Sequence, residues 1–159
     1  MKRLFTFSVL LLALALAVAC TPAANIDSGE GSAVAGTFDA LVESLAAAGL
    51  SAQEGDMFSG EEGDPLFDDS TPRSLTAGDA TIQVYEFATE AEAEAAAATV
   101  NPTGNIIGNK TVDWIEPPHF YRQSRFIVLY PGDDEAILSA LAIALGEPFV
   151  AGAGGFIQP

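Results

Sequence analysis

The sequence predicts an α+β fold, with a mainly antiparallel sheet of about four to five strands and helices packed on a face. Three observations lead to it. Two hairpin patterns lie at 73–87 and 119–131, a helix pattern follows each hairpin, and another helix pattern precedes the first. The chain therefore runs helix, strand, hairpin, helix, strands, helix.

The first helix is predicted to begin after Thr37 and to end before Gly49. Threonine accepts a hydrogen bond at a helix N-terminus, and glycine commonly ends a helix. Phe38, Leu41 and Leu45 recur at three- and four-residue spacing, which gives the helix one apolar stripe.

A short strand over 50–56, an acidic loop over 58–72 and the first hairpin are expected next. The hairpin arms are 73–77 and 80–87, separated by the turn pair Gly78-Asp79. The second arm has apolar residues on both faces, so it is predicted to be a central strand. These residues are Ile82 and Val84 on one face and Tyr85 and Phe87 on the other.

The segment 89–100 carries the clearest helix pattern. Thr89 and Glu92 have the spacing of a capping box, in which each side chain accepts a hydrogen bond from the other residue's backbone. Its alanines have high helix propensity and permit close approach to a sheet. Asn101-Pro102 is expected to end the helix.

The second half of the chain is predicted from weaker patterns. The expected elements are a loop over 101–109, a strand over 110–115, a hairpin from His119 that turns near Gln123 and Ser124, and a helix over 134–145. The run FIVLY, Phe126–Tyr130, is predicted to be a strand that is buried on both faces.

Two similar units are suggested by this order, since 73–100 and 113–145 each run from paired strands into a helix. A duplication of this kind can give a ferredoxin-like arrangement, which is the finer form of the fold prediction.

The first twenty residues have the layout of a secretory signal. Lys2 and Arg3 are positive, 4–18 is an apolar run, and small residues precede Cys20. An ordinary transmembrane anchor is the alternative, but the run is shorter than the ~20 residues that a spanning helix needs.

The Cys20 site resembles the lipobox of bacterial lipoproteins. The resemblance implies a diacylglyceryl thioether on Cys20 and removal of the signal peptide, 1–19. We then expect a flexible tether over 20–36, one domain over 37–150 and a Gly-rich tail over 151–159. Cys20 is the single cysteine, so no disulfide and no thiolate zinc site is expected.

The charge balance is strongly acidic. Without Lys2 and Arg3 the mature chain carries 4 basic and 22 acidic residues, a formal charge of −18. Such a surface repels nucleic acid and anionic headgroups, so nucleic-acid binding is rejected and membrane association is assigned to the acyl chains.

A wider resemblance covers most of 37–150. The chain is similar to small bacterial lipoproteins of unknown function, which implies export and one compact domain but supplies no catalytic residues. The stretches that carry it are VYEFATEAEAEAAAATV, NPTGNIIG, VDWIEPPHFYR and FIVLYPGDDEAILSALAIALGEPF.

The segment 110–125 is the candidate binding surface. It holds three of the four mature basic residues together with the single Trp and the single His, and Trp, Tyr and Arg are frequent anchors of binding sites. The alternative is that Trp114 and Phe120 are core residues and that the arginines pair with acidic groups. The candidates are Trp114, His119, Phe120, Tyr121, Arg122 and Arg125.

An acidic cluster is a weaker candidate for calcium, which prefers carboxylate and other oxygen ligands. Its spacing does not match an EF-hand, and a solvated acidic loop is the preferred alternative. The cluster consists of Glu61, Glu62, Asp64, Asp68 and Asp69.

Catalysis has little support in the sequence. Any catalytic triad must use His119, with Asp113, Glu116 or Ser124 nearby in the chain, but no G-x-S-x-G motif is present. No phosphate-loop or dinucleotide fingerprint is present either. We therefore expect no enzyme activity and no cofactor.

The preferred hypothesis is a lipid-anchored, non-catalytic interaction module of the cell envelope, with an envelope protein as partner. The alternative is a sensor or carrier of calcium or a small ligand, using the acidic loop or a pocket beside Trp114; a hydrolase is the third option. Thr21 after Cys20 implies, by resemblance to sorted lipoproteins, the outer membrane of a two-membrane cell.

Overall fold

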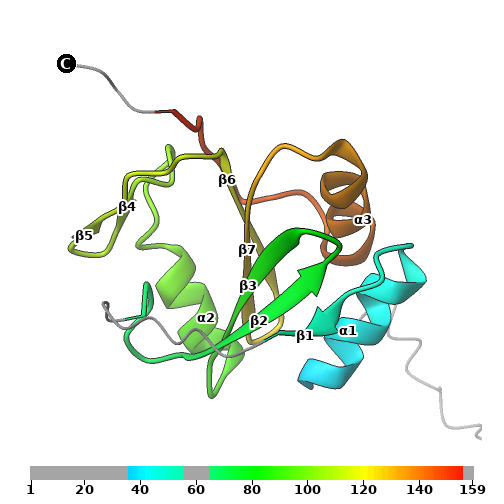
Figure 1. Ribbon diagram of the computed structural model, residues 1–159. Helices are drawn as coiled ribbons and strands as arrows, with labels where there is room; N and C mark the ends of the chain where they lie inside the picture. Colours follow the sequence, from blue (N-terminus) through cyan, green and yellow to red (C-terminus); the bar gives the residue numbers. More distant parts are fainter. Residues whose placement is uncertain (1–35, 56–64, 156–159) are drawn as a thin grey trace, which may run out of the picture. The chain divides into compact units, whose positions relative to one another are not determined.

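The computed structural model describes residues 36–55 and 65–155 (Figure 1). The predicted signal peptide, Cys20 and the part of the predicted tether up to residue 35 lie outside the described residues, as do 56–64 and 156–159. Among the described helices, none is long and apolar enough to cross a membrane.

Three helices and eight strands make up the described part of the chain. In order they are α1 (Phe38–Ala47), β1 (Gln53–Glu54), β2 (Thr71–Ala77), β3 (Ala80–Glu86), α2 (Glu90–Ala97), β4 (Ile106–Ile107), β5 (Lys110–Thr111), β6 (Pro118–Gln123), β7 (Phe126–Pro131), α3 (Glu135–Leu145) and β8 (Val150–Ala151).

The predicted α+β class is confirmed. Six strands form one antiparallel sheet in the order β1-β2-β3-β7-β6-β8, and β4 pairs with β5 in a separate two-stranded sheet. The main sheet exceeds the expected four to five strands because two-residue strands, β1 and β8, extend it at its two edges.

Helices cover both faces of the main sheet. α1 and α3 pack against one face, and α2 lies on the other (Figure 1). The central strands β3 and β7 are apolar on both sides, as predicted, because alternate side chains enter two separate cores. The α1/α3 core includes Val84 and Val128, and the α2 core includes Tyr85 and Leu129.

The ferredoxin-like arrangement is not confirmed. Two hairpin-helix units do occur, β2-β3-α2 and β6-β7-α3, and β3 pairs with β7 between them. A two-fold axis that relates neighbouring antiparallel strands keeps their helices on one face, whereas α2 and α3 lie on opposite faces. The units share an order of elements but not a symmetric packing.

Each of the three described helices begins with a side-chain cap, as predicted for Thr37 and for Thr89 with Glu92. Thr37 accepts from the Ala40 amide, Thr89 and Glu92 form the capping box, and Asp134 accepts from the amides at the start of α3. These side chains satisfy amides that have no partner within their own helix. Because the caps are local, the sequence located each helix start correctly.

Weaker strand predictions needed correction. The strand expected over 110–115 is limited to Lys110–Thr111, and the one expected over 50–56 to Gln53–Glu54. Each of these short segments pairs with one neighbouring strand, so its length is set by that partner and not by its own side-chain pattern.

Part of the Gly-rich C-terminal segment packs closely on the sheet. Val150 and Ala151 form β8 against β6, and the Gly152 amide donates to the Pro118 carbonyl at 2.9 Å. A Cβ at Gly152 would lie 2.3 Å from the Thr103 carbonyl oxygen, so only glycine permits this approach.

Candidate functional site

Two of the predicted surface residues, Phe120 and Tyr121, are buried. They are neighbours on β6, so their side chains enter opposite cores, Phe120 on the α2 side and Tyr121 on the α1/α3 side. Burial raises the pKa of Tyr121 to about 12. Neither side chain is accessible to a partner, which corrects their inclusion in a surface.

The arginines at the end of the predicted segment pair with the protein's own acids. Arg122 Nη1 lies 3.8 Å from Glu90 Oε1. Arg125 Nη2 lies 2.5 Å from Glu86 Oε1, and its Nε donates to the Gly36 carbonyl at 2.7 Å. This is the alternative that the sequence left open for the arginines.

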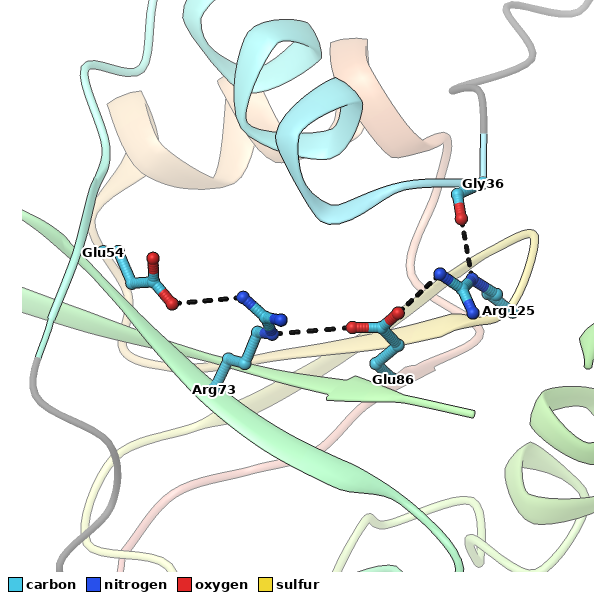
Figure 2. A network of polar contacts seen from close by, with 5 residues as sticks. All are labelled: Gly36, Glu54, Arg73, Glu86 and Arg125. Carbon is cyan, nitrogen blue, oxygen red and sulfur yellow. Dashed lines mark hydrogen bonds and ion pairs between the residues drawn. The ribbon is translucent and has the colours of Figure 1, made fainter. Parts of the chain in front are cut away.

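The Arg125 contacts belong to a chain of polar contacts along one end of the sheet (Figure 2). Glu86 Oε2 lies 3.5 Å from Arg73 Nε, and Arg73 Nη1 donates to Glu54 Oε1 at 3.1 Å. The network thus joins the residues before α1 to β1, β2, β3 and the β6–β7 turn. The network thereby ties the start of α1 to the sheet. Both of its arginines, Arg73 and Arg125, are paired with carboxylates of the protein itself.

The remaining basic residue of the described part, Lys110, is also engaged. Its ammonium forms an ion pair with Asp68 and donates to the Pro65 carbonyl at 2.6 Å. Asp68 is one of the candidate calcium ligands, and Glu61, Glu62 and Asp64 lie outside the described residues. Within 36–55 and 65–155, no three His, Cys, Asp or Glu side chains are grouped so that they could hold a metal ion.

His119 is half-buried at the start of β6. Its Nδ1 lies 3.1 Å from the Pro117 carbonyl oxygen, and its ring stacks on Tyr130 with centroids 6.5 Å apart. Ser124 follows the opposite end of β6, roughly 16 Å along the strand at about 3.3 Å per residue. The two therefore lie too far apart along the strand to act as base and nucleophile.

Trp114 is held rigidly beside the sheet. Its Nε1–H donates to the Gly104 carbonyl at 2.7 Å, and its ring meets Phe120 edge-to-face with centroids 6.1 Å apart. Gly104 has a φ of 73°, and a Cβ there would lie 3.0 Å from the Phe120 ring. A glycine at this turn therefore lets the carbonyl reach the indole.

A groove with a volume of about 500 Å³ opens beside this tryptophan. We call it the Trp114 groove. Its walls are two loops and the C-terminal segment, which contribute Thr103, Asn105, Val112, Asp113 and Trp114 together with 153–155.

Exposed apolar side chains lie close in the sequence to residues that line the Trp114 groove. Ile115 is 71% exposed and follows Trp114, while Ile106 is 43% exposed and follows Asn105. Phe149, which is 38% exposed, packs on Phe120 and thereby joins the same group of rings. Ile143 on α3 is the remaining large hydrophobic of the described residues that is strongly exposed. Three of these four side chains are thus linked to the groove by sequence or ring contact.

A larger groove of about 620 Å³ lies beside α2, next to the Lys110–Asp68 ion pair. Phe67 and Phe87 line it, but both rings are buried among the α2 core. Lys110 and Asp68 pair with each other, Glu92 caps α2, and the aromatic rings are buried, so this groove is the weaker candidate for recognition.

The sequence pointed to Trp114 but missed its partners. Thr103, Asn105 and 153–155 were assigned to a loop and a tail, since neither carries a periodic pattern. The Pro-Thr-Gly-Asn turn and the closely spaced glycines at 152–155 are the signals that mark these segments as tightly packed. No known protein family, curated protein or solved structure matches this chain.

Proposed function

We propose that this chain is a lipid-anchored, non-catalytic interaction module of the cell envelope that binds an envelope protein through the Trp114 groove. The observation that carries the proposal is a tryptophan that lines an open groove, is fixed by a hydrogen bond to Gly104 and is followed in the chain by the exposed Ile115. Tryptophan is enriched among the few residues that dominate binding energy, and apolar surface beside it excludes water from such contacts.

Rigidity of the groove favours binding. The Trp114 indole is fixed by its hydrogen bond to Gly104 and by Phe120, so it loses little rotamer freedom when a partner covers it. Immobilising a flexible side chain costs about 0.5–1.5 kcal/mol, and a preorganised one avoids most of that cost.

The position of the tether suits this role. Gly36, where the expected tether ends, is held by Arg125 beside the β6–β7 turn. The groove lies near Pro118 at the other end of β6, because Gly104 approaches the Pro118 ring. The expected tether would therefore meet the domain at the end of the sheet opposite the groove.

The proposed anchor and address rest on the sequence. A diacylglyceryl group on Cys20 would hold the mature chain to the membrane from outside the cytoplasm, on the outer membrane if the cell has two. The resemblance to small bacterial lipoproteins supports the same address.

A small-ligand carrier is the second candidate function. Its support is the volume of the Trp114 groove, about 500 Å³, which lies within the range of small-molecule sites. If a discrete small molecule, and not a protein, is found in the Trp114 groove, the carrier is favoured over the interaction module.

Photo-crosslinking in living cells tests the proposal. A photoreactive residue replaces Ile115 beside the groove or, as a matched control, Ile143 on α3, since the two side chains are 71% and 70% exposed. We expect one discrete protein adduct from position 115 and none from position 143. Equal labelling from both positions, or no adduct from a protein shown to be folded and exported, would contradict the proposal.

A further inference from the structure

The charges of the Trp114 groove are unbalanced. Asp113 is the single charged residue that lines it. The described part of the chain contains four basic side chains, and their ion pairs use Glu54, Glu86, Asp68 and Glu90. Asp113 is therefore not neutralised from within the described domain.

Two polar donors of the groove are engaged by other groups of the protein. Asn101 Nδ2 donates to Asn105 Oδ1 at 2.9 Å, and the Thr103 hydroxyl donates to the same oxygen at 2.7 Å. The Trp114 N–H is used by the Gly104 carbonyl. The Thr103 hydroxyl and the Trp114 N–H are therefore used inside the protein, while Asp113 lies at an exposed position.

A tryptophan and a carboxylate that line one groove provide a favourable environment for an organic cation. A cation is attracted to the ring quadrupole of tryptophan, the most favourable of the aromatic side chains. The fixed indole and the adjacent Asp113 would act on one cation together, and the formal charge of −18 on the mature chain adds a long-range attraction.

We infer that the partner inserts a basic side chain, preferentially arginine, into the Trp114 groove between the indole and the Asp113 carboxylate. This inference rests on the proposed function and names the chemistry of the partner. Arginine fits best because its planar guanidinium stacks on an aromatic ring and can pair with a carboxylate through two hydrogen bonds.

The first test repeats the crosslinking from position 115 in two charge variants. Asp113→Asn removes the groove carboxylate, and Asp79→Asn removes the same charge from the exposed β2–β3 turn. We expect the adduct to fall by roughly fivefold in Asp113→Asn, the effect of a partly exposed ion pair, and to stay unchanged in Asp79→Asn.

The second test uses the sole tryptophan of the chain as the reporter. The full lipidated protein in detergent is titrated with acetyl-Gly-Arg-Gly amide, and the same peptide with citrulline in place of arginine serves as the uncharged control. We expect a saturable change in Trp114 emission with the arginine peptide alone, and an affinity roughly fivefold weaker in Asp113→Asn.

The outcomes separate the inference from the function on which it rests. If the adduct at position 115 is insensitive to Asp113→Asn, or if the two peptides change Trp114 emission equally, the inference of a basic side chain is wrong, but the proposed interaction module is not contradicted. Equal loss of the adduct in Asp113→Asn and Asp79→Asn would also contradict the basic side chain, because the effect would not be specific to the groove carboxylate. Absence of any adduct, with the arginine peptide still bound, would overturn both in favour of a small cationic ligand.

Discussion

Helices α2 and α3 each follow a hairpin, yet they are held to the sheet in different ways. α3 buries five residues of its eleven, among them Ile137, Leu141 and Leu145. α2 buries only Ala93 of its eight. The large side chains on the α2 face come instead from the sheet and the segment before it, as in the edge-to-face contact between Phe67 and Tyr85 at 5.0 Å.

The difference shows that a helix can be held on a sheet in two ways. α3 gains stability from apolar area on the helix itself, at about 25 cal/mol per Å² removed from water. α2 presents a nearly smooth alanine surface, so its stability depends on close approach and on its capping box. The two helices should therefore respond in different ways to substitution.

The largest effect is expected from Leu141→Ala in α3. Leu141 is fully buried between α3 and the sheet, and its truncation should lower the free energy of unfolding by about 2–5 kcal/mol through lost burial and a cavity. Denaturant unfolding of the full protein measures the change. Ile143→Ala on the exposed side of α3 is the control and should stay within about 0.5 kcal/mol; similar losses in both would show that α3 is not held by its buried face.

In α2 we expect a smaller loss of stability, caused by added volume and not by removed volume. Ala93→Leu adds volume at a fully buried position where α2 lies close to the sheet, and should lower the free energy of unfolding by about 1–3 kcal/mol. Ala91→Leu adds the same volume at an exposed position and should change stability by less than about 0.5 kcal/mol. If Ala93→Leu were neutral under denaturant, the close approach of α2 would not be a constraint.

The helix caps should give the smallest effect and sharpen the comparison. Thr89→Ala and Asp134→Ala each remove a capping side chain and should each cost about 1 kcal/mol, whereas Thr89→Ser and Asp134→Asn keep the cap. Amide hydrogen exchange should show greater loss of protection in α2 than in α3, because α2 has less buried area to hold it. Equal loss in both helices would argue against this distinction.

Local signals were sufficient for the helices and for both hairpins. Thr37 and Thr89 act within one turn of their own position, so the sequence located these caps without knowledge of the fold, whereas the structure identifies Asp134 as the cap of α3. The alternation in β3 and the apolar run in β7 likewise reported burial on two faces. Strands β1, β4, β5 and β8 were misjudged or missed, because two residues carry no period and their pairing depends on a neighbour; β4 lies in the segment 101–109 that was predicted to be a loop.

The candidate site was only partly predictable. Trp114 stood out as the sole tryptophan, and a pocket beside it was one of the alternatives. The sequence grouped it with Phe120 and Tyr121, but adjacent residues on a strand point to opposite faces, which places both in the cores. Thr103, Asn105 and 153–155 could not be assigned, since loops far apart in the sequence meet there.

The sequence by itself determined the α+β class, the starts of the three helices, the central position of β3 and the acidic excess, because each depends on composition or on neighbours within a few residues. The tertiary structure alone decided that α2 and α3 lie on opposite faces, that the four basic side chains of the described domain pair with its own acids, and that a groove forms beside Trp114. These features join residues tens of positions apart, and the path of the chain around the sheet brings them together.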